Sequence, residues 1–126
     1  MMKLVYALAM GMAALLAPLT ASAQTLAPLT LELPGEAERT VVAYACRTSA
    51  DAEPETLSVE YINLPGNNFA LLPIEGQPTL FVQVLAGSGA QYVANDMVWW
   101  TKGVRGDLYS QRAPDAAGRT VCRVQR

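Results

Sequence analysis

The feature that most constrains this chain is a succession of short apolar runs, broken at intervals of about ten residues by Gly, Pro, Asn or Asp. Short runs rich in β-branched and aromatic residues between such breaks are typical of strands. The run 56–63, TLSVEYIN, shows the alternation most clearly, because Leu57, Val59 and Tyr61 share one face of an extended chain. We therefore predict eight strands, over residues 41–48, 56–63, 69–74, 79–85, 90–94, 97–101, 104–110 and 119–125.

The fold class that follows is all-β. The loops between the runs are too short for crossover helices, so neighbouring strands are expected to run antiparallel. A chain this small cannot leave long apolar edges open, which favours closure into a barrel or a compact sandwich. Two polar segments, 49–56 (SADAEPET) and 110–118 (SQRAPDAAG), are interpreted as solvated loops.

The first 23 residues have the order of a secretory signal. Lys3 supplies a positive start, residues 4–19 form an apolar run, and Ala21-Ser22-Ala23 is a small-residue cleavage site before Gln24. The run is broken by Pro18 and is shorter than the ~20 residues that a membrane span requires. We predict a cleaved signal peptide and a soluble periplasmic product. A lipid anchor is not expected, because the first cysteine lies far downstream of the cleavage site.

The predicted mature chain has 103 residues, which suffices for one small domain. Within it, residues 24–38 form a lead-in, either a tether or an extra edge strand, and residues 39–126 form the domain. Eight basic and eleven acidic residues remain after the signal, a formal charge of −3, and this balance argues against a nucleic-acid partner.

The two cysteines, Cys46 and Cys122, are expected to pair in an oxidising compartment. The bond would tie the first strand of the domain to the last. Closing a loop of about 76 residues stabilises a fold by roughly 4–5 kcal/mol in the chain-entropy description. The chain has no histidine, so two cysteines offer too few soft ligands for a metal, and we predict neither a metal nor a cofactor.

The segments around Ser88 do not match the enzyme motifs that they resemble. The segment 86–90, AGSGA, lacks the glycines that a serine elbow requires at both ends, and no histidine is present to act as a base. A catalytic dyad of Ser88 and Lys102 is chemically conceivable, but it would also need an oxyanion hole and a substrate groove. The segment 87–92, GSGAQY, has Tyr92 at the third glycine position of a dinucleotide loop. We therefore predict a protein that is not an enzyme.

A hairpin is expected over residues 90–101, with its turn at Asn95-Asp96. A two-residue turn pairs positions whose numbers sum to 191, and a longer turn shifts the sum to 190 or 192. In each register Lys102 lies near Gly89, so Ser88 and the lysine share one end of the hairpin, where flanking glycines allow a partner to approach closely. Most aromatic residues are expected to fill or cap the core: Tyr44, Tyr61, Phe81, Trp99 and Trp100.

Trp99 and Trp100 are adjacent and must face opposite sides of a strand. One of them is expected in the core. The other is expected to be at least partly exposed beside Lys102, where an indole could border a binding surface.

These motifs, taken in chain order, resemble a known family: the bacterial inhibitors of c-type lysozyme, membrane-bound and periplasmic, called MliC/PliC. The resemblance covers about residues 40–123. It is carried by the pattern S-G-x-x-Y, by T-K-G and by the cysteines, in the segments Tyr44-Ala-Cys46, Val59-Glu-Tyr61, Ser88-Gly-Ala-Gln-Tyr92, Trp100-Thr-Lys102-Gly103 and Cys122.

The resemblance implies an eight-stranded antiparallel barrel closed by a Cys46–Cys122 disulfide. It also implies that Ser88 and Lys102 enter the lysozyme cleft and bind its catalytic carboxylates, within a lysozyme-binding set of Ser88, Gly89, Tyr92, Thr101, Lys102 and Gly103. The chain departs from the family in having Gln91 where many members carry arginine, and Gly87 before the serine where a small residue such as alanine is usual.

The sequence thus predicts a periplasmic inhibitor of c-type lysozyme. The rival interpretation is a periplasmic β-barrel binding module for a small ligand or an envelope protein, which has kept the scaffold without inhibition. Gln91 is the residue that keeps this alternative open, since losing the arginine could weaken affinity for lysozyme.

Overall fold

The computed structural model describes residues 11–20, 22, 26–115 and 118–126. The chain divides into two units, Met1–Leu31 and Glu32–Arg126. The charged start and the cleavage site of the predicted signal, Lys3, Ala21, Ala23 and Gln24, lie outside the described residues. Among those that are described, no helix is long and apolar enough to cross a membrane.

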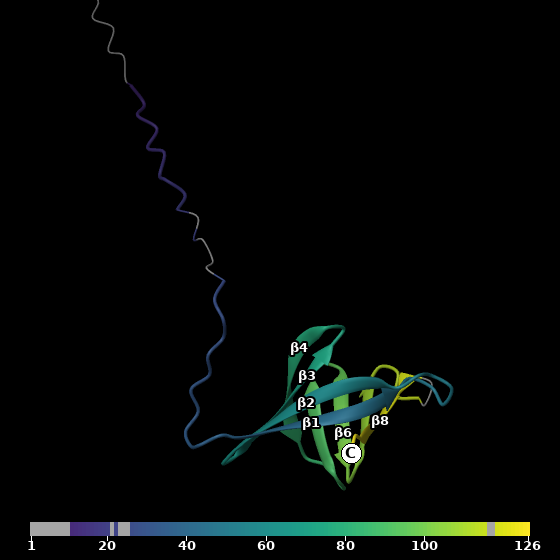
Figure 1. The fold of residues 1–126 in the computed structure, drawn as a ribbon. Coiled ribbons are helices and arrows are strands. Elements are labelled where there is room, and N and C mark those ends of the chain that lie inside the picture. The colour runs from purple at the N-terminus through teal and green to yellow at the C-terminus, as the bar shows by residue number, and fades with distance from the viewer. Residues whose placement is uncertain (1–10, 21, 23–25, 116–117) are drawn as a thin grey trace, which may run out of the picture. The chain divides into compact units, whose positions relative to one another are not determined.

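The second unit is a closed barrel in which each strand pairs antiparallel with its neighbours in sequence and β8 returns to pair with β1 (Figure 1). The predicted closure is therefore a barrel and not a sandwich. The predicted strand limits agree with the structure to within three residues. The strands are β1 (Glu38–Arg47), β2 (Glu55–Leu64), β3 (Asn67–Ile74), β4 (Gln77–Val84), β5 (Ala90–Ala94), β6 (Met97–Lys102), β7 (Arg105–Ser110) and β8 (Thr120–Val124).

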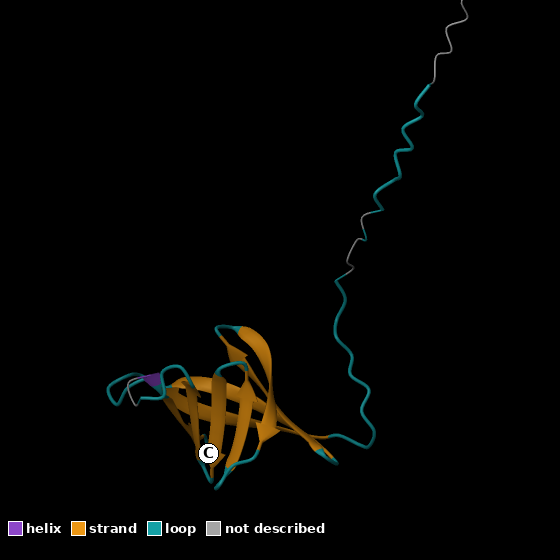
Figure 2. Ribbon diagram, turned by 180° about the vertical axis from the view of Figure 1, so that it is seen from behind, coloured by secondary structure: helices purple, strands orange, loops and turns teal. Residues whose placement is uncertain are grey.

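The lead-in contains no strand over residues 26–37, so the structure gives no extra edge strand before β1. The first strand itself begins at Glu38, three residues earlier than predicted. Its pairing with β2 runs from Glu38 to Cys46, whereas β8 pairs only with Tyr44–Arg47. The strands form the wall of the barrel and the short connections lie at its ends (Figure 2).

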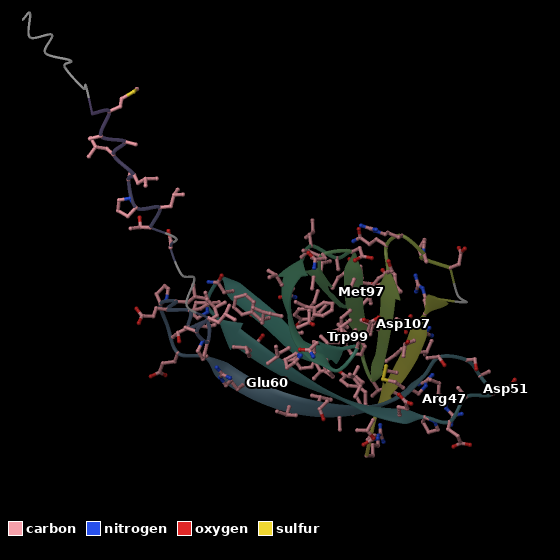
Figure 3. All side chains as sticks on the ribbon, turned by 90° about the horizontal axis from the view of Figure 1, so that it is seen from above. Arg47, Asp51, Glu60, Met97, Trp99 and Asp107 are labelled. Atoms are coloured by element: carbon pink, nitrogen blue, oxygen red, sulfur yellow. A yellow bond between two sulfur atoms is a disulfide. The ribbon has the colours of Figure 1, made fainter. Side chains whose placement is uncertain are left out.

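Trp99 fills the centre of the barrel and is fully buried. Its indole N–H donates to the Tyr61 hydroxyl at 3.0 Å, and that hydroxyl lies 2.8 Å from the Tyr44 hydroxyl. The Tyr44 ring meets the indole edge-on at 5.1 Å between centroids. Burial is the main reason that the pKa of Tyr61 is raised above its usual range. Figure 3 shows Trp99 inside the barrel, and the other buried core residues include Val59, Ala70, Leu72, Phe81, Tyr92 and Cys122.

Gly106 on β7 makes room for this central ring. A Cβ built at Gly106 would collide with the six-membered ring of Trp99, which lies one strand away on β6. The alternation predicted for 56–63 is also found, since Val59 is buried and both Leu57 and Tyr61 pack against the same core. The expected separation of the tryptophans is confirmed, because Trp100 faces outward and is half-buried.

The Cys46–Cys122 disulfide is present. The two cysteines are direct cross-strand partners of β1 and β8, so the bond joins the strands that close the barrel. Their side chains point into the core, with Cys46 6% and Cys122 0% exposed. The link thus holds the seam of the barrel from inside and leaves the outer faces of both strands free.

Candidate functional site

The β5–β6 hairpin has the register predicted for a two-residue turn. Ala90 pairs with Thr101 and Ala94 with Met97, so partner numbers sum to 191. Asn95 enables the turn by adopting a φ of 52°. At the other end of the hairpin, Lys102 lies opposite the loop that carries Ser88, which joins β4 to β5.

Gly89 is the contact point between that loop and β6. Its φ of 66° lies in the left-handed region, where side chains are strained. A Cβ at this position would also collide with the Thr101 carbonyl oxygen and lie 3.3 Å from the Lys102 Cβ. Only glycine therefore lets the Ser88 loop pack this closely against the strand that ends in the lysine.

Ser88 is exposed, and its loop is fastened through its backbone. The Trp100 indole N–H donates to the Ser88 carbonyl oxygen at 2.9 Å. The outward-facing tryptophan thus orients the loop, while the Ser88 hydroxyl makes no hydrogen bond with any of the described residues. The hydroxyl is left to face solvent or a partner.

Lys102 is the last residue of β6 and is exposed. Gly103, with a φ of 58°, turns the chain immediately after it and directs β7 back along the barrel. The lysine ammonium forms no salt bridge within the described part of the chain. A strand end, a tight turn and an unpaired cation therefore coincide beside the Ser88 loop.

Ser88 and Lys102 line one surface hollow of about 230 Å³. The rest of its wall comes from the outer faces of β6 and β7 and from the residue before β8: Trp100, Arg105, Asp107 and Arg119. The structure thus brings together the two polar groups that the sequence singled out, and it adds a charged group that the sequence reasoning missed.

That charged group is centred on Asp107, which is only 8% exposed. Arg105 donates to both carboxylate oxygens, at 2.8 and 3.1 Å, and Arg119 reaches one of them at 3.4 Å. The bond to Asp107 raises the pKa of Arg105. The Arg119 guanidinium also lies 4.1 Å over the Tyr109 ring. One carboxylate serves two arginines here, so this side of the hollow keeps a net positive charge.

The remaining predicted residues have supporting positions. Tyr92 lies in the core, 6% exposed, with its ring 5.8 Å from that of Tyr61, and its side chain does not reach the outer surface. Burial raises its pKa. Thr101 is half-buried, and its hydroxyl donates to the Ala90 carbonyl at 3.4 Å across the hairpin. Both residues hold the hairpin that presents Ser88 and Lys102.

No group of three or more carboxylate or cysteine side chains that could hold a metal ion occurs in the described residues. The hollow offers one hydroxyl, one indole, three cations and the Asp107 carboxylate, which two of those cations already bind. Its chemistry suits hydrogen bonding and ion pairing with an acidic partner.

A family model described as the membrane-bound lysozyme-inhibitor of c-type lysozyme, MliC, matches residues 44–117. The chain belongs to the MliC family. The match begins at Tyr44, includes Cys46 and the S-G-x-x-Y and T-K-G segments at the β5–β6 hairpin, and ends before Cys122.

Two curated relatives carry the description membrane-bound lysozyme inhibitor of C-type lysozyme. The one from Cupriavidus necator is 41% identical over 71 residues, which is 56% of this chain and 57% of the relative. The one from Pseudomonas aeruginosa is 37% identical over 82 residues, 63% of this chain and 61% of the relative. The alignments thus span about three-fifths of these relatives' length.

A solved structure, Pseudomonas aeruginosa MliC in complex with hen egg white lysozyme, is similar in fold. It superposes with a TM-score of 0.62 and 26% sequence identity, over 82% of this chain and 99% of the other. The barrel described above is therefore an MliC-family barrel.

Proposed function

We propose that this protein inhibits c-type lysozyme by inserting Ser88 and Lys102 into the active-site cleft of the enzyme. The observation that carries the proposal is their placement together: an exposed hydroxyl, and an exposed ammonium that forms no salt bridge with any described residue, line one hollow at one end of a disulfide-linked barrel. Membership of the MliC family and the similarity to an MliC that forms a complex with hen lysozyme support the choice of partner.

The chemistry of the two groups matches such a cleft. A lysozyme cleft holds one protonated and one ionised carboxyl group. The Lys102 ammonium can pair with the ionised one, and the Ser88 hydroxyl can donate to or accept from either. Charge-assisted bonds of this kind contribute roughly 1.5–3 kcal/mol each when they are shielded from water. Occupation of the cleft by these groups excludes the substrate.

The other predicted binding residues support this insertion. Gly89 and Gly103 shape the two turns that project the polar groups, and Thr101 links the strands at the same end. Tyr92 contributes from inside the barrel by anchoring β5 in the core. In this proposal only the turns at Gly89 and Gly103, and the residues on them, contact the enzyme directly.

The protein is proposed to act as a binding protein and not as an enzyme, because an inhibitor needs only to occupy the cleft. We also propose that residues 1–23 are removed and that the product is soluble in the periplasm. The family description says membrane-bound, so fractionation of cells decides between the two locations. Recovery in the membrane pellet after a high-salt wash would contradict the soluble form.

The test of inhibition uses the purified chain that begins at residue 24 and a c-type lysozyme acting on cell walls. Lys102→Ala should weaken binding by roughly 2–5 kcal/mol, or about 30-fold to several thousand-fold, because it leaves a lysozyme carboxylate buried without a partner. Ser88→Ala should weaken it less, since a neutral bond is lost. Affinity is measured by calorimetry alongside residual lysozyme activity.

The matched control is Arg112→Ala, which removes one positive charge at 86% side-chain exposure from the far end of β7. It should leave inhibition unchanged. If wild-type protein fails to bind c-type lysozyme at low salt, the proposal is wrong and the binding-module alternative is favoured. If Lys102→Ala inhibits as well as wild type, the lysine is not part of the mechanism.

A further inference from the structure

A second and larger hollow lies on the outside of the barrel, over the seam between β8 and β1. Its volume is about 550 Å³. It is lined by residues from both strands and from the loop that follows β1: Ala45, Arg47, Thr48, Ser49, Ala50, Pro54, Arg119, Val121 and Arg123. Volumes of about 300–1,000 Å³ are typical of sites for small molecules.

The floor of this hollow is rigid. Ala45 pairs with Arg123, and Arg47 with Val121, so these four side chains share the outer face of two paired strands. The disulfide joins the same two strands on the inner face. The Arg47 guanidinium donates to the Ala52 carbonyl at 3.0 Å and holds the overhanging loop. The paired strands, the disulfide and this bond thus hold the floor and one side of the hollow in place.

Three arginines and no acidic residue are found among the described residues that line it. The charge of Arg119 is partly compensated by the Asp107 carboxylate, which lies 3.4 Å from the guanidinium, but that carboxylate is already bound by Arg105. Arg123 forms no salt bridge in the described part of the chain. The nearby Glu53 lines a separate hollow, and Figure 3 shows Asp51 farther out than Arg47 at the tip of the loop.

The strand register adds a second observation. Lys102 on β6 pairs with Arg105 on β7, and Arg105 pairs with Arg123 on β8, so a row of three cations leads from the first hollow to the second. Asp107 binds Arg105 within this row. Like charges directly opposite each other destabilise a sheet. The chain as a whole has more acidic than basic residues, so this concentration of cations on one face is a local feature and calls for an anionic partner.

We propose that the hollow over the β8–β1 seam binds a small phosphate monoester. Arg47 and Arg123 form no salt bridge with the residues that the structure describes, so their two positive charges match the dianionic charge of the phosphate. Guanidinium forks also suit the phosphate oxygens. The hollow is too large for inorganic phosphate alone, and Ala45, Pro54 and Val121 supply an apolar wall for the organic part. A ligand with a single carboxylate carries one negative charge and would leave the charge of one arginine without a counter-charge. The hollow shares Arg119 with the hollow that Ser88 and Lys102 line, but it contains neither of those two residues, and the proposal does not depend on lysozyme inhibition.

The experiment titrates the full mature chain with phenyl phosphate, inorganic phosphate and benzoate, followed by calorimetry and by amide chemical shifts. Phenyl phosphate should bind most tightly and benzoate least, with shifts centred on residues 45–50 and 119–123. Arg123→Gln should weaken phenyl phosphate binding about tenfold or more, because one charge-assisted bond is lost. Arg47→Gln should have a similar effect.

The control is Arg112→Gln, with the same change of charge outside the hollow; it should bind phenyl phosphate like wild type. A second arm offers vesicles with and without phosphatidic acid, to distinguish a lipid headgroup from a soluble ester as the source of the phosphate. The proposal is overturned if phenyl phosphate does not bind, if it binds no better than benzoate, or if Arg123→Gln binds it like wild type. Thermal unfolding of each variant verifies that the barrel is intact.

Discussion

The two ends of the β5–β6 hairpin are built from similar residue types and are used in opposite ways. At the turn end, Asp96 is satisfied internally: its carboxylate accepts from the Ser110 hydroxyl at 2.7 Å, and its carbonyl accepts from the Gln111 amide at 2.7 Å. At the open end, the Ser88 hydroxyl and the Lys102 ammonium are exposed, and the described residues offer them no side-chain partner. A serine and a charged residue occur at both ends.

The difference shows which polar groups stabilise the fold and which remain available for binding. Hydrogen bonds of Asp96 tie the β5–β6 turn to the end of β7 and stabilise the barrel. At the open end the backbone is held, by Gly89 against Thr101 and by Trp100 on the Ser88 carbonyl, while the polar side chains are left free. A rigid backbone with unpaired side chains is preorganised for a partner. Substitutions at the two ends should therefore separate stability from binding.

Among the substitutions that compare the stability of the two ends, Gly89→Ala should have the largest effect. The new side chain is strained at a φ of 66° and collides with the Thr101 carbonyl, so the loop must move away from β6. Overpacking and a left-handed conformation together cost about 2–4 kcal/mol. Both the free energy of unfolding, measured in urea, and the affinity for lysozyme should fall, because this residue connects the backbone support to the exposed groups.

Gly87→Ala is the matched control. A Cβ at Gly87 has nothing within 4 Å, and its φ lies outside the left-handed region. The substitution should change stability by no more than about 0.5 kcal/mol and leave binding unchanged. Equal effects at the two glycines would show that general flexibility of the loop, and not the close contact at Gly89, supports the open end.

The sequence predicted this end of the hairpin well, for a physical reason. Strand alternation and a two-residue turn fix the register, and the register places Lys102 beside the Ser88 loop without knowledge of the rest of the fold. The disulfide was equally predictable, because only two cysteines are available. In contrast, nothing in the local pattern showed that Tyr92 points into the core, since a tyrosine next to a binding motif suits either face.

The next effect concerns the turn end and depends on pH. The Ser110 hydroxyl bond is the main cause of a lowered pKa of Asp96 in the fold, so this carboxylate stabilises the barrel above its usual pKa of about 3.9 and loses that effect as the pH falls. Ser110→Ala should lower stability at pH 7, and the gap to wild type should narrow as the pH falls below about 4. Urea unfolding at several pH values measures it.

Thr79→Val is the control for a hydroxyl whose acceptor does not titrate, because Thr79 donates to the Gln77 carbonyl at 2.9 Å. Any difference in the free energy of unfolding between Thr79→Val and wild type should stay constant over the same pH range. Affinity of Ser110→Ala for lysozyme should equal that of wild type at pH 7, since the turn lies at the opposite end of the hairpin. A loss of affinity would contradict the separation of the two ends.

The charged parts of the surface were the hardest to predict. Arg105 and Asp107 lie on β7, whereas Arg119 directly precedes β8, and only the pairing of β7 with β8 brings Arg119 to the same hollow. Sequence alternation indicates that alternate residues of 104–110 share a face, but not which face or which neighbours. The seam hollow was missed for the same reason, because it exists only once β8 has closed on β1.

The smallest effect is expected for Trp100→Phe, which keeps an aromatic ring and removes the N–H that holds the Ser88 carbonyl. One hydrogen bond at a half-buried position contributes under about 1 kcal/mol, so stability should change little. Lysozyme affinity should fall by a few-fold, because fewer molecules hold the Ser88 hydroxyl where the enzyme needs it. A double-mutant cycle gives the decisive readout: if Trp100 acts by positioning Ser88, then Trp100→Phe has no further effect on affinity once Ser88→Ala is present. Additive losses would instead mean that the indole contacts the enzyme by itself.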